Sequence, residues 1–379
     1  MNKIRLLFFV ITILFLSYGI SNAQVTVTNL NDSGPGSLRD AITIQANPGD
    51  TIQFAESLAG GTITLLSEIA INNSLTITGP AAGITTISGG GSTRIFNITG
   101  NNTMTIVITG LRLANGFING AGGGAIRLQG PNIELNDCVF DSNTAICNGF
   151  DCDASGAGLD NRGGVINLVI NRCTFVSNSS TCSGNECDAS GAGLDNGGGS
   201  LTIEVNNSTF ASNFSSCSGI DCRESGSSID TSNGLVIYSS IFSTDSPEGN
   251  CRDIEDIVSL GYNIDNGSTC ITGAVTGDKP NTPPGLDPVG ARDNGGPTPT
   301  IALLIGSPAI DMGDPNCPPP ATDQRGVLRP QGPRCDIGAF EGVLQAAQIP
   351  TLSEWGLVAM AGLLGIIGFM VIIRRKVTA

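Results

Sequence analysis

The segment that decides the fold reads Cys138-Val-Phe-Asp-Ser-Asn-Thr-Ala-Ile-Cys-Asn-Gly-Phe-Asp-Cys-Asp-Ala-Ser-Gly-Ala-Gly-Leu-Asp160. It returns 35 residues later as Cys173-Thr-Phe-Val-Ser-Asn-Ser-Ser-Thr-Cys-Ser-Gly-Asn-Glu-Cys-Asp-Ala-Ser-Gly-Ala-Gly-Leu-Asp195. A third, degenerate copy runs from Ser208 to Asp230 with the same spacing. A fixed period of this length is typical of a repeat architecture, in which each unit buries its apolar face only against its neighbours.

Short alternating apolar runs in these repeats predict strands rather than helices. Ile133 and Leu135 alternate before one corner of the chain, and Cys138 and Phe140 alternate after it. Because equivalent positions recur in every copy, we predict an all-β fold, a right-handed single-stranded parallel β-helix whose coils stack about 4.8 Å apart. The stacking predicts an inward aromatic ladder of Phe140, Phe175, Phe210 and Phe242 and an asparagine ladder at a turn, made of Asn143, Asn178 and Asn213.

The N-terminus and the composition indicate an exported chain. Residues 1–23 have a basic start, an apolar run and the small-residue site Ser21-Asn-Ala23, so we predict a signal peptide. Twelve cysteines, all after position 137, fit an oxidising compartment. With 33 acidic and 18 basic residues the net charge is −15, which makes nucleic acid and anionic membrane surfaces poor partners.

Residues 24–48 are expected to form an N-terminal cap that covers the end of the solenoid core. They contain the strand-like Val25-Thr-Val-Thr28 and one short amphipathic helix near Leu38-Arg-Asp-Ala-Ile42. The segment resembles the "SLREAI" opening of many bacterial secreted β-helix proteins, with Gly36-Ser37 where those proteins often have a cysteine. The β-helix itself is predicted to span 49–245.

Residues 246–342 carry a second set of motifs, which include Gly306-Ser-Pro-Ala-Ile-Asp311, Asp323-Gln-Arg-Gly326 and Cys335-Asp-Ile-Gly-Ala-Phe-Glu341. This region resembles the choice-of-anchor Q module of bacterial surface proteins. Ile301 is a departure, since that family often has histidine there. The resemblance implies a surface protein without enzymatic activity.

The C-terminus is predicted to contain a linker with a sorting motif at 343–354, a transmembrane helix at 355–373 and a basic cytoplasmic tail at 374–379. The motif residues are Ile349, Pro350, Thr351, Leu352, Trp355 and Gly356. Together these features resemble the IPTL-type sorting tail, a relative of the PEP-CTERM type. The resemblance implies an exosortase-family partner and an intermediate anchored in the inner membrane of a Gram-negative bacterium, with the β-helix outside. A permanent membrane anchor is the alternative.

Five disulfides are expected in an exported chain with this cysteine spacing. Three are local pairs and two close loops in the C-terminal module: Cys147–Cys152, Cys182–Cys187, Cys217–Cys222, Cys251–Cys270 and Cys317–Cys335. Cys138 and Cys173 should remain thiols, because stacked positions about 4.8 Å apart exceed the Cβ separation that a disulfide prefers. A cysteine-only zinc site is the alternative for the Cys-x4-Cys pairs.

The sequence predicts no catalytic, cofactor-binding or metal site. It contains no histidine, which excludes Ser/His/Asp and Cys/His catalysis. The acids that recur at the repeat period are Asp153, Asp160, Asp188, Asp195 and Asp230. Their repetition suggests scaffold, although a polysaccharide lyase or hydrolase working with surface carboxylates is an alternative. A calcium ladder is another, but the repeat matches neither known calcium loop.

We therefore expect an adhesin or a structural component of the extracellular matrix. Any binding face should lie on the polar excursions 149–160, 184–195 and 219–230, which repeat as a multivalent surface requires. Its ligand, a glycan or a protein, is not specified by the sequence.

Overall fold

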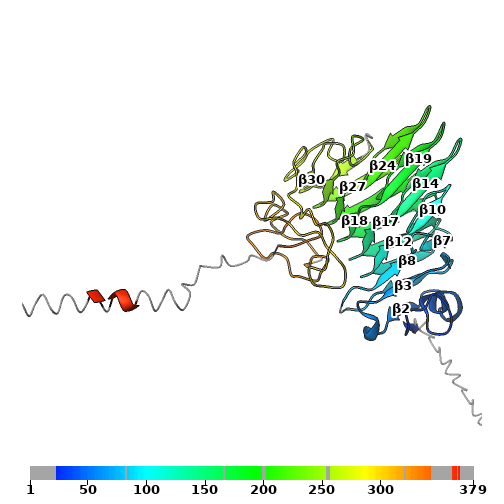
Figure 1. Ribbon diagram of the computed structural model, residues 1–379, viewed down its shortest axis with the longest axis horizontal. Coiled ribbons are helices and arrows are strands. Elements are labelled where there is room, and N and C mark those ends of the chain that lie inside the picture. Colours follow the sequence, from blue (N-terminus) through cyan, green and yellow to red (C-terminus); the bar gives the residue numbers. More distant parts are fainter. Residues whose placement is uncertain are drawn as a thin grey trace, which may run out of the picture. The chain divides into compact units, whose positions relative to one another are not determined.

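The computed structural model describes residues 23–81, 83–164, 167–198, 202–252, 257–319, 321–342, 361–364, 366 and 367. The β-helix and the segment that follows it belong to one compact unit, which ends at Glu341, and residues 342–379 form a second unit. Figure 1 shows the coils of the first unit stacked in sequence order from β2 to β27.

Every pairing between the named strands is parallel, as the all-β prediction requires. Three sheets form the body of the solenoid, with strand order as follows. Sheet A contains β1 (Gln24–Val27), β2 (Thr51–Phe54), β5 (Leu75–Thr78), β8 (Thr105–Thr109), β12 (Asn132–Asn136), β17 (Asn167–Asn171), β22 (Thr202–Asn206), β27 (Leu235–Tyr238) and β29 (Ile257–Ser259). Sheet B contains β3 (Thr62–Thr64), β6 (Thr86–Ser88), β9 (Arg112–Ala114), β13 (Val139–Asp141), β18 (Thr174–Val176), β23 (Thr209–Ala211), β28 (Ile241–Ser243) and β30 (Ile264–Asp265). Sheet C contains β4 (Ile69–Ile71), β7 (Phe96–Thr99), β11 (Ile126–Gln129), β16 (Leu159–Asn161), β21 (Leu194–Asn196) and β26 (Ile229–Thr231).

Two smaller sheets are added where the 35-residue repeats occur. Sheet D contains β10 (Phe117–Asn119), β14 (Thr144–Asn148), β19 (Ser179–Ser183) and β24 (Phe214–Ser218), and sheet E contains β15 (Asp153–Ser155), β20 (Asp188–Ser190) and β25 (Arg223–Ser225). In each repeat the chain leaves sheet B along a D strand and returns to sheet C along an E strand. The repeat is therefore one coil with an arm, and Figure 1 shows β14, β19 and β24 extending beyond the coils.

The predicted ladders are confirmed in register. Phe140 pairs with Phe175 and Phe175 with Phe210, and the stacked rings of these pairs lie 4.3 and 4.5 Å apart at their centroids. The Phe210 and Phe242 rings follow at 5.5 Å, and all four phenylalanines are buried. Because each large side chain meets an identical or similar one, a narrow core is filled without gaps.

The three asparagines of the ladder are buried in the core. Their backbone does not adopt the left-handed conformation. Asn178 Nδ2 donates to the Phe140 carbonyl at 2.9 Å and to Asn213 Oδ1 at 2.9 Å, and Asn143 repeats the pattern one coil earlier. The left-handed backbone falls on the preceding residues, Ser142, Ser177 and Ser212, with φ of 53–55°. The buried amides thus find hydrogen-bond partners in the next coil and in a strand carbonyl of the preceding coil.

The N-terminal segment has the short helix expected of a cap. Helix α1 (Leu38–Asp40) continues into the π-helical turn η1 (Ala41–Gln45), and a 3-10 turn η2 (Glu56–Leu58) follows β2. Ser37 caps α1 by accepting a hydrogen bond from the Asp40 backbone N–H. Leu38 and Ile42 are buried in the same apolar cluster as the first coils, so the turn covers one end of the core.

Residues after the last coil pack sideways against sheet B. The Gln324 side chain accepts a hydrogen bond from Thr174 Oγ1 at 2.7 Å, and the Gly338 N–H donates to the Ser239 carbonyl at 2.8 Å. Ile301 is buried against Val139 and Val176. Ile301 is therefore part of the apolar contact between this segment and sheet B.

The two ends of the chain lie largely outside the described residues. This holds for the predicted signal peptide, except for Ala23, and for the sorting motif and the basic tail. Of the predicted transmembrane segment 355–373, residues 361–364, 366 and 367 are described, and they are helical. Among the residues described, no helix is both long and apolar enough to cross a membrane.

Candidate functional site

The three arms stack into a thin double layer that we call the fin, made of residues 144–155, 179–190 and 214–225. Its interior holds alanine and cysteine instead of large apolar residues: Ala145, Cys147, Ala154, Cys182, Cys187 and Ala189 are buried there. Small side chains let the two sheets approach closely, but they bury little apolar surface. The fin therefore needs additional links, which the cysteines supply.

The cysteines of the fin stack in register, since Cys147 pairs with Cys182 and Cys182 with Cys217 along sheet D. The structure joins Cys147 to Cys152 and Cys217 to Cys222. The predicted Cys182–Cys187 bond is absent, and both residues are free thiols. This is a correction to the sequence prediction.

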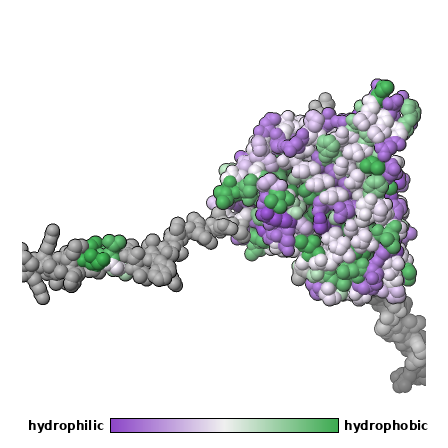
Figure 2. Space-filling view, in the orientation of Figure 1, coloured by the Kyte–Doolittle hydropathy of each residue, from purple (hydrophilic) through white to green (hydrophobic). Residues whose placement is uncertain are grey.

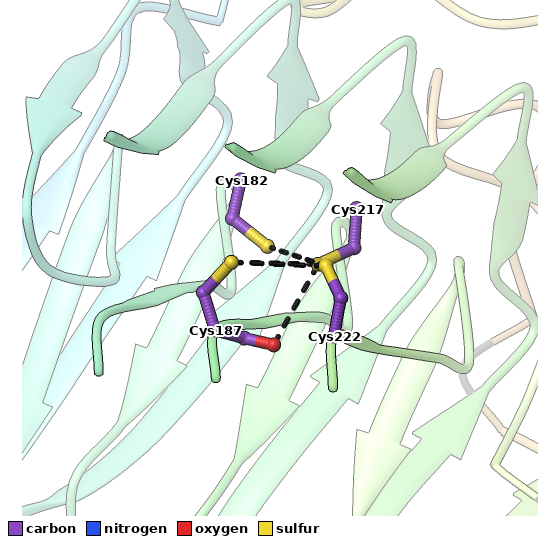
Figure 3. A group of neighbouring side chains, drawn as sticks. All are labelled: Cys182, Cys187, Cys217 and Cys222. Carbon is purple, nitrogen blue, oxygen red and sulfur yellow. Dashed lines mark hydrogen bonds between the residues drawn. A yellow bond between two sulfur atoms is a disulfide. The ribbon is translucent and has the colours of Figure 1, made fainter. Parts of the chain in front are cut away.

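The reason for the open pair lies in the stacking. Cys187 Sγ is 3.6 Å from Cys217 Sγ and 3.7 Å from Cys222 Sγ, and Figure 3 shows Cys182 and Cys187 both pointing toward that pair. The sulfurs of Cys217 and Cys222 in the next coil thus compete with Cys182 for contact with the Cys187 sulfur. Repeat spacing alone does not decide which pair forms.

A metal is the other use of four converging sulfurs. The ligand atoms of Cys182, Cys187, Cys217 and Cys222 all lie within 4.8 Å of one another. Zinc binds thiolates, however, and the Cys217 and Cys222 sulfurs are joined to each other. The donor set present does not fit a metal ion.

The remaining cysteines lie in the body of the unit. Cys251 is bonded to Cys270 and Cys317 to Cys335. Cys138 and Cys173 are fully buried thiols, and the Cys138 N–H donates to Cys173 Sγ at 3.4 Å. These positions agree with the register argument made from the sequence.

An acidic groove runs where the fin meets sheet C. It consists of three adjoining pockets that share lining residues, and those residues are Asp151, Asp153, Glu186, Asp188, Asp195, Asp221, Arg223, Glu224, Asp230, Glu248, Arg162 and Arg252 together with neighbouring serines and cysteines. The groove lies on the face that the sequence assigned to binding. Figure 2 shows the described surface as a mixture of hydrophilic and hydrophobic residues.

Two ladders of acids form the inner wall of the groove. Asp153 pairs with Asp188, and Asp160 pairs with Asp195, which in turn pairs with Asp230. The side chains of Asp160, Asp195 and Asp230 are at most 6% exposed. Burial raises the pKa of Asp160 to about 6 despite the neighbouring Arg162. Burial, reinforced by the charges of Asp160 and Asp230, raises the pKa of Asp195 well above its ordinary value.

Arginines compensate the ladders unevenly. Arg162 binds Asp160 through Nε at 2.7 Å, and it also forms an ion pair with Asp153. Arg252 Nη1 lies 3.4 Å from Asp230. Asp188 and Asp195 form no ion pair with a described residue.

Sequence reasoning overlooked two basic residues of this groove. Arg223 occupies the repeat position of Asp153 and Asp188, so an alignment of the copies would have found it. Arg252 comes from a segment outside the repeats, and no periodicity could place it.

The buried charges of the C-terminal segment form a structural cluster instead of a second site. Arg329 donates to the carbonyls of Asp336 and Gly338, both at 2.6 Å, and lies 3.4 Å from Glu341. The Arg325 guanidinium lies 3.7 Å from the centre of the Phe340 ring. These contacts fold the segment onto itself.

Comparison with known proteins identifies the tail. Residues 347–376 match the model of the IPTL-CTERM motif, which indicates an exported protein with a C-terminal sorting tail. No curated protein matches the chain. A solved structure of pectate lyase Pel9A shares 14% identity over 85% of this chain and 97% of its own, with a TM-score of 0.27. A likeness this weak tells nothing about activity. The parallel β-helix is inferred from the sheet topology, and export of the chain is inferred from its sorting tail.

Proposed function

We propose that this chain is a bacterial surface protein that acts as an adhesin or matrix component, with the fin and the acidic groove as its binding face. The observation that carries the proposal is the coincidence of repeated arms, a continuous groove and a sorting tail in one chain. Repeated, equivalent surfaces favour multivalent attachment over a single catalytic event.

The C-terminal part of the proposal is that residues 246–342 are a choice-of-anchor Q module. Its motif residues support a structural role, since the pairs Arg325–Asp323 and Arg329–Glu341 hold the segment together and Gln324 hydrogen-bonds Thr174 of sheet B. An exosortase-family enzyme would then process the tail at the inner membrane of a Gram-negative cell, and the β-helix would be displayed outside.

Replacing the arms tests the binding face. Short turns in place of 146–153, 181–188 and 216–223 keep every coil but remove the outer fin. Cells that display this variant should lose adhesion while the protein keeps the circular dichroism of a β-helix. Adhesion at the level of the unmodified chain would disprove the proposal. The matched control replaces the loop 274–277, which lies outside the fin.

A polysaccharide-cleaving enzyme is the second candidate, favoured by one observation. Two carboxyl groups of adjacent coils, Asp160 and Asp195, lie beside the groove. Both have raised pKa values, and glycoside cleavage uses two carboxyl groups of which one, the general acid, has a raised pKa. Release of reducing or unsaturated ends from a panel of neutral and acidic polysaccharides, lost in Asp195→Asn, would support it. Absence of cleavage by the unmodified chain would leave the adhesin.

A further inference from the structure

The first repeat contains an arginine site that the second repeat reproduces without the arginine. In the first coil Arg162 donates to Asp160 Oδ2 at 2.7 Å and to Ser155 Oγ at 2.9 Å, and Asp153 completes its ion pairs. The side chain is thus held by two carboxylates and a hydroxyl. Charge-assisted bonds of this kind are the strongest that a guanidinium forms.

The second coil keeps all three acceptors, as Asp188, Ser190 and Asp195, which pair in register with those of the first coil. The residue at the position of Arg162 is Gly197. We call this group of three acceptors the cradle. The third coil differs, because Ser232 follows there and Arg252 reaches Asp230 from another segment.

The two carboxyl groups of the cradle have no ion-pair partner among the described residues. Asp188 Oδ1 is buried and receives no hydrogen bond from the described residues. Asp195 is only 6% exposed, yet its one hydrogen bond comes from Ser190 to Oδ1 at 2.9 Å. The serine has changed its role, since the equivalent Ser155 accepts from Arg162.

The free oxygen of Asp195 faces the place that the arginine would take. A Cβ built on Gly197 would lie 3.3 Å from Asp195 Oδ2, and a pocket of about 220 Å³ opens there. Its lining includes Asp188, Ser190 and Asp195. This volume suits one side-chain group and is below that of sites for larger ligands.

Charge around the pocket favours a cation. Four carboxyl groups line the pocket with two guanidinium groups, Arg162 and Arg252. The four acids are Asp153, Asp188, Asp195 and Asp230. Arg223 stands beside Asp188 in the next coil without forming an ion pair with it, and it is not part of the lining. A cation in the cradle would give Asp188 and Asp195 the charged partner that Arg162 gives their counterparts, and so compensate the buried Asp195 carboxyl group and the unbonded Asp188 Oδ1.

We propose that the cradle binds a guanidinium group from outside the chain, namely an arginine side chain of a partner protein. The ligand chemistry is that of Arg162, transferred to the second coil. The inference rests on the proposed binding function of the groove and specifies what its central pocket recognises.

Titration of the purified full chain with N-acetylargininamide tests the proposal, with N-acetyllysinamide, free arginine and CaCl₂ as alternative ligands. The capped arginine should bind with the highest affinity, because only a planar guanidinium can contact both carboxylates and the hydroxyl. Preference for the lysine analogue or calcium would overturn the guanidinium assignment. Preference for free arginine would overturn the protein partner.

Filling the cradle from within is the sharper test. Gly197→Arg should raise the melting temperature and weaken binding of the capped arginine by at least about tenfold, the factor given by one charge-assisted hydrogen bond. The matched control Gly197→Gln occupies similar space without the charge and should not raise the melting temperature. Equal stabilisation by both substitutions, or undiminished binding to Gly197→Arg, would overturn the inference.

The reverse substitution creates a second cradle. Arg162→Gly should lower the melting temperature, and the capped arginine should restore part of the loss. A loss that the ligand does not restore would count against the cradle. A chain that adheres to cells but binds no capped arginine would overturn this inference alone, whereas loss of the arms tests the proposed function.

Discussion

At the scale of single residues, the stability of this protein is concentrated in stacked polar side chains as much as in its apolar core. The side-chain amide of Asn178 forms four hydrogen bonds. Its Oδ1 accepts two from the backbone N–H and the Nδ2 of Asn143, and its Nδ2 donates to the Phe140 carbonyl and to Asn213 Oδ1. A buried group of this kind costs more to remove than it contributes when present, because its partners are left unsatisfied.

Asn178→Ala should therefore destabilise the chain by about 3 kcal/mol, since the Asn143 N–H and the Phe140 carbonyl lose bonds inside the core. Asn171→Ala is the matched control, because Asn171 stands in a similar ladder on the half-buried surface and should cost less than about 1 kcal/mol. Urea unfolding followed by circular dichroism measures both. Equal losses would show that burial of the ladder does not matter.

The buried acids predict an unusual dependence on pH. Asp160 and Asp195 have raised pKa values in the folded chain, so the unfolded chain releases its protons first as the pH rises. The unfolded state then binds fewer protons than the folded state, and the free energy of unfolding decreases with increasing pH through this interval. For Asp160 the interval runs from 3.8 to about 6.

Asp195→Asn should remove part of this decrease, because asparagine keeps an oxygen for Ser190 but carries no charge. At pH 7 it should be more stable than the unmodified chain, and this difference should shrink as the pH falls toward the ordinary pKa of an aspartate, because the unfolded chain then keeps its proton as well. Asp221→Asn, at the exposed end of an arm, is the control and should leave the pH dependence as it is. A gain that stays the same as the pH falls would contradict the mechanism.

At the scale of elements, the arms depend on their cysteines, and the number of free thiols tests the arrangement. Cys138, Cys173, Cys182 and Cys187 are free and buried, so we expect slow labelling of the native chain and four labelled thiols in denaturant. The double variant Cys182→Ser with Cys187→Ser should leave two. Two labelled thiols in the unmodified chain would show that Cys182 and Cys187 are bonded to each other after all.

The repeats made the coils predictable, whereas the arms and the groove needed the structure. Ile133, Leu168 and Ile203 stand in register because identical spacing leaves one way to stack like side chains. The segment from Cys147 to Asp160 shows no strand-like alternation, so the sequence did not predict the arm strands. Each of these strands pairs with the equivalent strand of the neighbouring coil. Pairing of Cys187 depends on distances between coils that periodicity does not contain, and Arg252 enters the groove from outside the repeats.

At the scale of the whole molecule, a narrow core is protected at one end and along one side. The N-terminal turns bury Leu38 and Ile42 over the first coils, and the segment after the last coil binds sheet B through Gln324 and Gly338. Both segments cover parts of the solenoid that would otherwise be exposed and could pair with other chains. Protection of this kind is compatible with the export that the sorting tail indicates.

The tail carries the last prediction. Residues 347–376 match the IPTL-CTERM motif, and a plain membrane anchor would need only an apolar span with a basic flank. The defined peptide Ile349-Pro-Thr-Leu352 and Trp355 therefore suggest recognition by a processing enzyme. We expect cleavage between Thr351 and Trp355, so that the mature chain lacks Arg374, Arg375 and Lys376. Intact mass of protein extracted from the cell surface measures the end of the chain, and Pro350→Ala with Thr351→Ala should accumulate the longer form in the membrane. A surface species that still ends at Ala379 would refute processing and leave a β-helix held by a permanent anchor.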